Sequence, residues 1–452
     1  MKLSDLQAAF GGEVRGDSFF EQVSTDTRTL KSGTWFFALR GERHDGHHHL
    51  AQAVAAGASA LIVETPLADC LVSQWVVKDT LLALQQTAMY WRNKCGHITR
   101  FALTGSSGKT TTKEMLAAML STQGLTLATQ GNLNNHIGVP LTLLALRPEH
   151  RFAVIELGAN HVGEIDQTAA LVCPDCVTIT NIGWAHLDGF GGRQGIAKGK
   201  SEIFHHSGAQ GVAVINLDDE WSDYCRHQAQ SLHQITVSMK NPDADVHVVS
   251  QLPDQHGCFA IDLLVRGQPL PRIQLPVMGE HNVINASLAI GMCLAVPDID
   301  LVKASRALER IPGISGRMCR HECGSVTVID DSYNANPDSM RKAIDVLAVQ
   351  PGRKILVLGD MAELGSAAGE EHVHVGAWAA MKKIDALYAV GEYADFYAEG
   401  FGSRTRLYSD RRALVADLLG ELEGVVSLLV KGSRSSKMDE VVTVLLKEQG
   451  TC

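Results

Sequence analysis

The sequence predicts an α/β protein with three domains. Its 452 residues correspond to about three domains at roughly 150 residues each. From residue 98 onward, apolar strands alternate with helices, which is typical of a mostly parallel, doubly wound sheet. A Gly- and Pro-rich segment at 311–316 interrupts this region and indicates a linker. We therefore expect domains at 1–80, 81–312 and 313–452.

The first predicted domain holds short strands and one clear helix. Residues 34–39 and 60–63 are apolar runs of strand length, and residues 49–56 predict a helix that Gly57 ends. Three histidines at 47–49, with His44 nearby, have a metal-like composition. We interpret them instead as the start of that helix.

Beyond residue 98 the alternation is regular, with one interruption. The turn-rich segment 236–278 predicts an antiparallel excursion, and a helix over 283–294 follows it. After the linker, a smaller α/β domain without a phosphate loop is expected. The expected strands are 98–103, 152–156, 177–181 and 212–216 in the central domain and 326–330, 354–358, 386–390 and 426–430 in the last domain.

The stretch LTGSSGKTTT at 103–112 predicts a nucleotide site between a strand and a helix. Its glycine turn would aim backbone N–H groups at an anion, Lys109 would reach the β/γ-phosphates, and the Thr110 hydroxyl would bind magnesium. The loop is shorter than the usual G-x-x-x-x-G-K-[ST] pattern, because Leu103 stands where the first glycine is expected. The residues expected to bind ATP or GTP here are Gly105, Ser106, Ser107, Gly108, Lys109, Thr110 and Thr111.

Charge and composition exclude several classes of protein. The net charge of −10 argues against general nucleic-acid binding, which needs a basic surface. No apolar run of about 18 residues is present, so no membrane span is expected, and the start of the chain lacks a signal-peptide core. A cytoplasmic location with mostly free thiols is the simplest interpretation. Cys173 and Cys176 form a C-x-x-C, but a zinc site needs two further ligands.

Two candidate metal ligands follow strands of the central domain. Glu156 ends the strand at 152–156, where phosphate-loop proteins often place an acid that binds magnesium. His186 lies in the loop after the strand at 177–181, at the sheet edge that faces ligands in open α/β folds. His186 is therefore a candidate second ligand.

A predicted helix at 196–204 carries two lysines. Lys198 and Lys200 are two residues apart, so they cannot share one helix face. Glu202 follows Lys198 at the spacing of a surface ion pair, whereas Lys200 has no acid at that spacing. We therefore expect Lys200 to point inward.

Polar clusters at loops and strand ends are further candidates. Asn134 and Asn135 are either turn formers or ligand-binding residues, and Asn282 is either a helix cap or a ligand-binding residue. In the last domain, the segments 330–337, 359–365 and 431–434 each follow a strand. All three should therefore lie on one rim of the last sheet.

These motifs, in this order, resemble the Mur ligase family, the ATP-dependent amide-bond-forming enzymes of peptidoglycan synthesis. The resemblance covers essentially the whole chain and includes the short phosphate loop. Residues 24–41 are similar to the family's UDP-binding domain, and the three last-domain segments resemble the members that add D-alanyl-D-alanine. The resemblance implies a small N-terminal α/β UDP-binding domain, a central P-loop ATPase domain with a mostly parallel sheet, and a C-terminal Rossmann-like α/β domain.

The resemblance also assigns roles around the nucleotide. Thr110 and Glu156 would hold one Mg²⁺, and His186 would help to hold a second. A carbamylated lysine of the family matches Lys200, because Ile203 and Phe204 stand at the expected offsets after it. Asn282 would contact the adenine, Asp331 the ribose and Arg317 the γ-phosphate. The substrate contacts that the resemblance implies are Thr27, Arg28, Asn134, Asn135, Asn334, Asn336, Lys431 and Arg434.

The implied reaction joins UDP-N-acetylmuramoyl-tripeptide to D-alanyl-D-alanine at the expense of ATP. The tripeptide carboxylate attacks the γ-phosphate, and the dipeptide amine then attacks the acyl phosphate. The last domain must close on the central one for this chemistry, and a monomer is the default expectation.

Three alternatives stay open at this point. A sister ligase that adds a diamino acid has a comparable first domain. A folate-polyglutamylating enzyme shares the short loop but generally lacks such a first domain. A nucleotide-dependent switch without ligase activity gives no reason for Lys200, His186 and the last-domain motifs to occur together.

Overall fold

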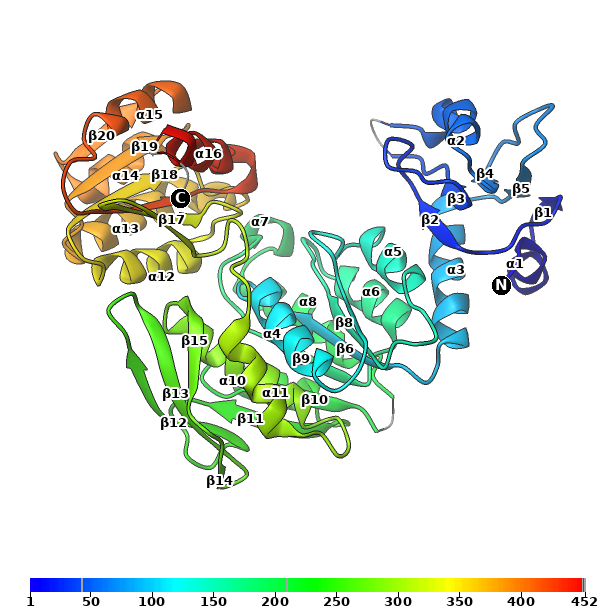
Figure 1. Ribbon diagram of the computed structural model, residues 1–452, viewed down its shortest axis with the longest axis horizontal. Coiled ribbons are helices and arrows are strands. Elements are labelled where there is room, and N and C mark those ends of the chain that lie inside the picture. The colour runs from blue at the N-terminus through cyan, green and yellow to red at the C-terminus, as the bar shows by residue number, and fades with distance from the viewer. Residues whose placement is uncertain (42–43, 209, 449, 451–452) are drawn as a thin grey trace.

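The computed structural model describes residues 1–41, 44–208, 210–448 and 450, and it contains three β-sheets in chain order (Figure 1). Each sheet takes its strands from one of the three predicted segments. The sheets are mostly parallel and carry helices, so the predicted α/β class is confirmed. Among the described residues, no helix is both long and apolar enough to cross a membrane.

The first sheet has the strand order β1-β5-β4-β3-β2, in which only the pair of β1 with β5 is antiparallel. His47 lies in a turn before α2, where its Nδ1 bonds Asp45 and its Nε2 accepts the Glu64 N–H. This histidine therefore helps to build the start of the helix, as expected. The elements are α1 (Leu3–Phe10), β1 (Glu13–Arg15), β2 (Gln22–Ser24), β3 (Thr34–Phe37), α2 (Leu50–Ala55), β4 (Ala60–Val63), β5 (Ser73–Val76) and α3 (Thr80–Lys94).

The central sheet has the order β14-β13-β12-β11-β10-β9-β6-β8-β7, with β15 paired to β13. From β7 to β12 the strands are parallel, and β12 to β15 form the predicted antiparallel excursion. The strands are β6 (Thr99–Thr104), β7 (Thr126–Ala128), β8 (Phe152–Glu156), β9 (Cys176–Ile179), β10 (Val212–Asn216), β11 (His233–Ser238), β12 (Val246–Pro253), β13 (Cys258–Val265), β14 (Gln268–Pro269) and β15 (Ile273–Met278). The helices are α4 (Lys109–Ser121), α5 (Gly138–Leu144), α6 (Glu164–Val172), α7 (Leu187–Phe190), α8 (Arg193–Ser201), α9 (Ser222–Gln228), α10 (His281–Cys293) and α11 (Leu301–Arg306).

The last sheet has the order β16-β17-β21-β18-β19-β20, and only β16 runs antiparallel to its neighbour. The carboxyl ends of its parallel strands carry the three predicted rim segments. Its elements are β16 (Cys319–Cys323), β17 (Val326–Asp331), α12 (Pro337–Ala348), β18 (Arg353–Leu358), α13 (Ala368–Met381), β19 (Ala386–Val390), α14 (Ala394–Phe401), β20 (Thr405–Tyr408), α15 (Arg411–Leu419), β21 (Val426–Lys431) and α16 (Met438–Glu448).

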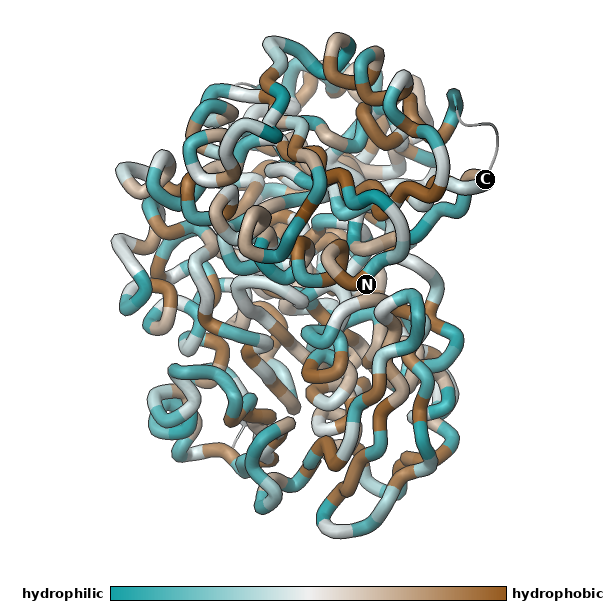
Figure 2. The backbone as a smooth tube through the Cα atoms, turned by 90° about the vertical axis from the view of Figure 1, so that its left-hand side faces the viewer, coloured by the Kyte–Doolittle hydropathy of each residue, from teal (hydrophilic) through white to brown (hydrophobic). Residues whose placement is uncertain are grey.

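The domains are joined in two different ways. One apolar cluster runs from the first domain, with Trp35, through α3 into the central domain, with Ile155. The last domain has two apolar clusters of its own, and Met278 of the central domain enters one of them. Hydrophobic stretches run through all of the molecule in Figure 2.

Polar contacts add to the joint between the central and last domains. The turn between β12 and β13 contacts the last domain, where Gln350 donates to the His256 carbonyl (3.0 Å) and Arg320 bonds the His256 ring. The turn is also tied to its own domain, because Gly279 N–H donates to Gly257 (2.9 Å). The antiparallel excursion thus reaches the end of α12.

We expect Leu429→Ala to destabilise the last domain by about 2–5 kcal/mol, because it leaves a cavity in the middle of a sheet. Leu429 is 0% exposed on β21, between β17 and β18. Leu407→Ala on edge strand β20, where the side chain is 45% exposed, should cost less than about 0.5 kcal/mol. Urea unfolding followed by circular dichroism measures both, and equal losses would contradict this account.

Candidate functional site

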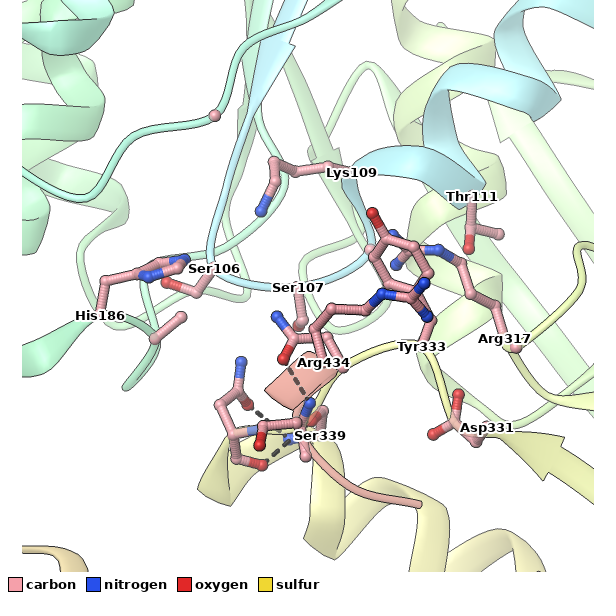
Figure 3. Close-up of a pocket in the computed structure, with 18 of the residues that line it drawn as sticks. Ser106, Ser107, Lys109, Thr111, His186, Arg317, Asp331, Tyr333, Ser339 and Arg434 are labelled. Carbon is pink, nitrogen blue, oxygen red and sulfur yellow. Dashed lines mark hydrogen bonds between the residues drawn. The ribbon is translucent and has the colours of Figure 1, made fainter. Parts of the chain in front are cut away.

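A cavity of about 620 Å³ lies between the phosphate loop and the rim of the last sheet (Figure 3). It is formed by loops at the carboxyl ends of strands in both domains, by the start of α10 and by the segment before β16. The predicted site residues that line it are Ser106, Ser107, Gly108, Lys109, Thr111, Asn134, Asn135, Glu156, His186, Asn282, Arg317, Asp331, Asn334, Asn336, Lys431 and Arg434.

The phosphate loop runs from β6 into α4 and depends on two glycines. Gly105 and Gly108 both have positive φ values, of 152° and 78°. A Cβ atom at Gly105 would lie 1.9 Å from the Thr180 hydroxyl, and one at Gly108 would lie 2.6 Å from Asn285. Only glycine fits this close approach of backbone to neighbouring side chains.

Asn181, just after β9, fixes the phosphate loop. Its carbonyl accepts the Ser106 N–H (3.0 Å), and its side-chain oxygen accepts the Ser107 N–H (3.0 Å). Lys109 bends back over the loop and donates to the Gly105 carbonyl (2.7 Å). Burial lowers the pKa of Lys109, the Glu156 carboxylate opposes that shift, and Arg317 adds to it.

Glu156 is positioned by three side chains at the end of β8. The Thr110 hydroxyl donates to one of its oxygens (2.8 Å) and the Asn134 amide to the other (2.8 Å), while Thr129 accepts its backbone N–H (3.0 Å). Asn134, predicted as a substrate contact, is therefore bonded to the predicted metal ligand. Asn135 accepts the N–H groups of Ile137 and Gly138 and so shapes the start of α5.

The donors around Glu156 fit a magnesium ion. The Glu156 carboxylate lines the cavity, and the buried Thr110 hydroxyl bonds it from behind at 2.8 Å. Mg²⁺ in nucleotide sites commonly takes one or two such oxygens together with phosphate oxygens and waters. In the described ranges, no group of three or more His, Cys, Asp and Glu side chains could hold a metal ion. A magnesium ion here would therefore depend on phosphate oxygens and waters for its remaining ligands.

The two lysines of α8 lie as predicted, with one correction. Lys200 is buried and lies 5.5 Å from the centre of the Phe190 ring, whereas Lys198 is exposed. Burial, with the nearby charge of Lys109, lowers the pKa of Lys200 well below its ordinary value. The predicted surface pair of Lys198 with Glu202 is wrong, because Glu202 is buried and accepts N–H groups from Gly163 and Asp166 instead.

On the last-domain side, Asp331 and Lys431 form a buried ion pair at 2.5 Å. Burial raises the pKa of Asp331, and the charges of Lys431 and Arg317 oppose that shift. Lys431 also donates to the Asn334 carbonyl (2.9 Å) and thereby holds the loop after β17. Asn336 caps α12 by accepting the Ser339 N–H.

Arg317 and Arg434, both predicted site residues, converge on the ring of Tyr333, which was not among the predicted site residues. The Arg317 guanidinium lies 4.2 Å from the centre of the Tyr333 ring, and that of Arg434 lies 5.8 Å away. Figure 3 places all three side chains beside the phosphate loop. The cavity thus brings a strong positive charge to the place where phosphate groups would lie.

At the start of α10, the side chain of Asn282 is held by hydrogen bonds within the helix region, whereas His281 lies in the cavity wall. Asn282 is 3% exposed and donates to the Met278 carbonyl (2.7 Å), while Asn285 donates to its side-chain oxygen (2.9 Å). His281 lines the cavity, and burial followed by the charges of Lys342 and Lys431 lowers its pKa to about 3. His281 and Lys342 were missed because neither stands in a recognisable motif.

Thr27 and Arg28 lie in the first domain, away from this cavity. The Thr27 hydroxyl donates to Gln52 (2.9 Å), and Arg28 pairs with Asp26 (2.6 Å). Arg28 is 83% exposed, so it is open to a ligand. Figure 1 shows the first domain at the far side of the central domain from the last domain.

Fold and site together define a nucleotide-dependent enzyme with a phosphate loop and a cavity shared by two domains. Comparison with known proteins gives its family. Residues 20–88 match the model "Mur ligase family, catalytic domain", 103–293 match "Mur ligase middle domain", and 316–434 match "Mur ligase, glutamate ligase domain". The chain belongs to the Mur ligase family, and it is an ATP-dependent, amide-bond-forming ligase.

Relatives and solved structures agree with this assignment. The UDP-N-acetylmuramoyl-tripeptide–D-alanyl-D-alanine ligase of Escherichia coli is 41% identical over 100% of this chain and 99% of its own length. A crystal structure of MurF from Acinetobacter baumannii has a TM-score of 0.91 and 39% identity and covers 98% of each chain. A MurF ligase of Thermotoga maritima in complex with ADP has a TM-score of 0.83 at 24% identity, covers 95% of this chain and 97% of its own, and supports the fold.

We expect His281 to make stability depend on pH. Its pKa is about 3 in the folded protein and about 6.5 in an unfolded chain, so the unfolded state takes up a proton first as the pH falls. Wild type should therefore lose about 1–2 kcal/mol relative to His281→Gln between pH 7.5 and pH 5. Urea unfolding of both proteins at each pH measures this, and a constant difference would rule the shift out.

Proposed function

We propose that this ligase joins the terminal carboxylate of UDP-N-acetylmuramoyl-tripeptide to the amine of D-alanyl-D-alanine, with release of ADP and phosphate. One observation carries the proposal: the last-domain segments that resemble the dipeptide-adding members form the cavity wall opposite the phosphate loop. The Escherichia coli relative described above is named for the same reaction. We further propose that the enzyme works in the cytoplasm. We also propose that it works as a monomer, since a single chain supplies the whole cavity.

We propose that the nucleotide binds between the two domains. Lys109 and the N–H groups of the phosphate loop would hold its phosphates, with Ser106, Ser107 and Thr111 at the cavity wall. Asn282 would contact the adenine and Asp331 the ribose. Arg317, already directed at the loop by Tyr333, would bind the γ-phosphate.

We propose that Thr110, Glu156 and His186 would hold the magnesium ions that the reaction needs. Thr110 and Glu156 would hold one ion, and His186 would help to hold a second one near the acyl group. When bound, these ions offset the charge that gathers as the carboxylate attacks the γ-phosphate. Lys109 and Arg317 lower the same barrier by binding the transferring phosphoryl group.

The UDP-tripeptide, which donates the acyl group, would span the first and central domains. Thr27 and Arg28 would bind the uridine in the first domain, and the peptide would reach the cavity past Asn134 and Asn135. Asn334, Asn336, Lys431 and Arg434 would contact the dipeptide or the acyl phosphate from the last domain. The amine attacks the acyl carbon and loses a proton, the C–O bond to phosphate breaks, and the amide forms as phosphate leaves.

We expect phosphate release from ATP and Mg²⁺ to require both the UDP-tripeptide and D-alanyl-D-alanine. Colorimetric phosphate detection, with the ligated product identified by mass spectrometry, tests this directly. Phosphate release with a diamino acid and the UDP-dipeptide, but not with D-alanyl-D-alanine and the UDP-tripeptide, would show that the chain is instead the ligase that adds a diamino acid. Release with neither pair would show that the substrate proposal is wrong.

We propose that the buried Lys200 works as its carbamate, formed when the neutral amine adds CO₂ and releases one proton. Its lowered pKa favours the neutral amine that this reaction needs. Lys200→Ala should lose most of the activity and recover part of it with added short carboxylates such as acetate or formate. Lys198→Ala, on the exposed face of the same helix, is the matched control. Unchanged activity of Lys200→Ala would refute the assignment.

A further inference from the structure

The loop that carries His186 is held at three successive backbone amides. Each amide donates to a side chain from a different element, two of them in the central domain and one in the last. The bonds are Ile182 N–H to Asp219 (2.9 Å), Gly183 N–H to the Ser106 hydroxyl (2.9 Å) and Trp184 N–H to Asp338 of α12 (3.1 Å). Asp338 is thus one of the last-domain residues that hold this loop, together with Glu363, which contacts His186.

The Asp338 carboxylate lies close against the backbone of Gly183. A Cβ atom at Gly183 would lie 2.3 Å from the Oδ2 atom of Asp338, the same oxygen that accepts the Trp184 N–H. It would also lie 3.4 Å from the Ser106 side chain. The phosphate loop, the His186 loop and α12 therefore meet at one backbone position.

The shape of this loop decides where His186 points. His186 follows Trp184 by two residues and has a left-handed backbone, with φ of 59°. Its Nδ1 bonds Glu363 of the last domain, and its ring faces the cavity in Figure 3. The backbone segment that Asp338 holds at Trp184 thus leads within two residues to His186.

Asp338 also has local contacts, but they use its other oxygen. Oδ1 accepts from Arg341 one turn later (3.1 Å), and a carboxylate in the first turn of α12 suits the helix dipole. Neither contact explains why Oδ2 reaches across the domain boundary to a backbone amide. The hydrogen bond from the Trp184 N–H to Oδ2 is therefore separate from the role of Asp338 in stabilising α12.

We propose that Asp338 is a positioning residue, whose Oδ2 takes the Trp184 amide when the last domain closes and thereby sets His186 for the reaction. This inference rests on the proposed function, because it assumes that His186 acts on the acyl group through magnesium. Closure and the placement of His186 then become one event.

The test compares Asp338→Ala, which removes the acceptor, with Asp338→Asn, which keeps an acceptor oxygen without the charge. Asp345→Ala is the matched control, because Asp345 lies on the same helix and accepts from the Trp378 indole (3.1 Å) outside the cavity. Steady-state phosphate release gives kcat and KM. The emission of Trp184, obtained by subtracting the spectrum of a Trp184→Phe version of each variant, reports the loop without turnover.

We expect Asp338→Ala to lower kcat about 10- to 100-fold, because the imidazole is misplaced, with KM for ATP changed less than about twofold. The Trp184 emission should shift in Asp338→Ala, whereas Asp338→Asn and Asp345→Ala should stay close to wild type in both readouts. Equal kcat losses in the alanine and asparagine variants, or no loss in the alanine variant, would overturn the proposal.

Gly183→Ala provides a second test should Asp338→Ala not fold, because the added Cβ collides with the same oxygen. Gly183→Ala alone should reproduce the kcat loss and the shift of the Trp184 emission. Wild-type kcat and emission in Gly183→Ala would overturn the proposal. A wild-type enzyme without phosphate release would refute the proposed function instead, while the emission shift would still judge the Asp338 contact.

Discussion

The reciprocal bonding between Asn181 and the phosphate loop is the contact on which the site depends. Asn181 accepts from Ser106 and Ser107 and, through its amide, donates back to the Ser107 carbonyl (3.0 Å). Because Asn181 also begins the loop that leads to His186, one residue sets both the backbone of the phosphate loop and the origin of the His186 loop. Glu156, Thr110 and Lys109 are then placed by β8 and α4 around that fixed loop.

The two interdomain joints suit different tasks. The first and central domains share a continuous apolar cluster, whose separation would expose large hydrophobic surface and is therefore costly. The last domain meets the central one through Met278 and through polar contacts at two turns, which water can replace at small cost. The structure therefore favours motion of the last domain over motion of the first.

Much of the fold and of the site could be predicted from the sequence, because the signals were local. The phosphate loop and the inward direction of Lys200 follow from spacing along single elements. The edge strands β7, β16 and β20 were missed because they are short and partly exposed. The predicted start of the antiparallel excursion at residue 236 falls inside β11, so that strand was not recognised as a unit. The bond of Asn134 to Glu156, and that of Asp338 to Trp184 across 154 positions, depend on tertiary structure and leave no local pattern.

The polar contacts at both ends of α12 make this helix a lever. Asp338 holds its first turn to one loop, and Gln350, just past its last turn, holds the other end to the β12–β13 turn. Twelve residues of helix span about 18 Å, so a rotation of roughly 10° about the Gln350 end displaces the Asp338 end by about 3 Å. That displacement would break the hydrogen bond between Trp184 and Asp338, while the bond between Gln350 and His256 would stay intact. A small swing of the last domain would thus act as a switch at the far end of the helix.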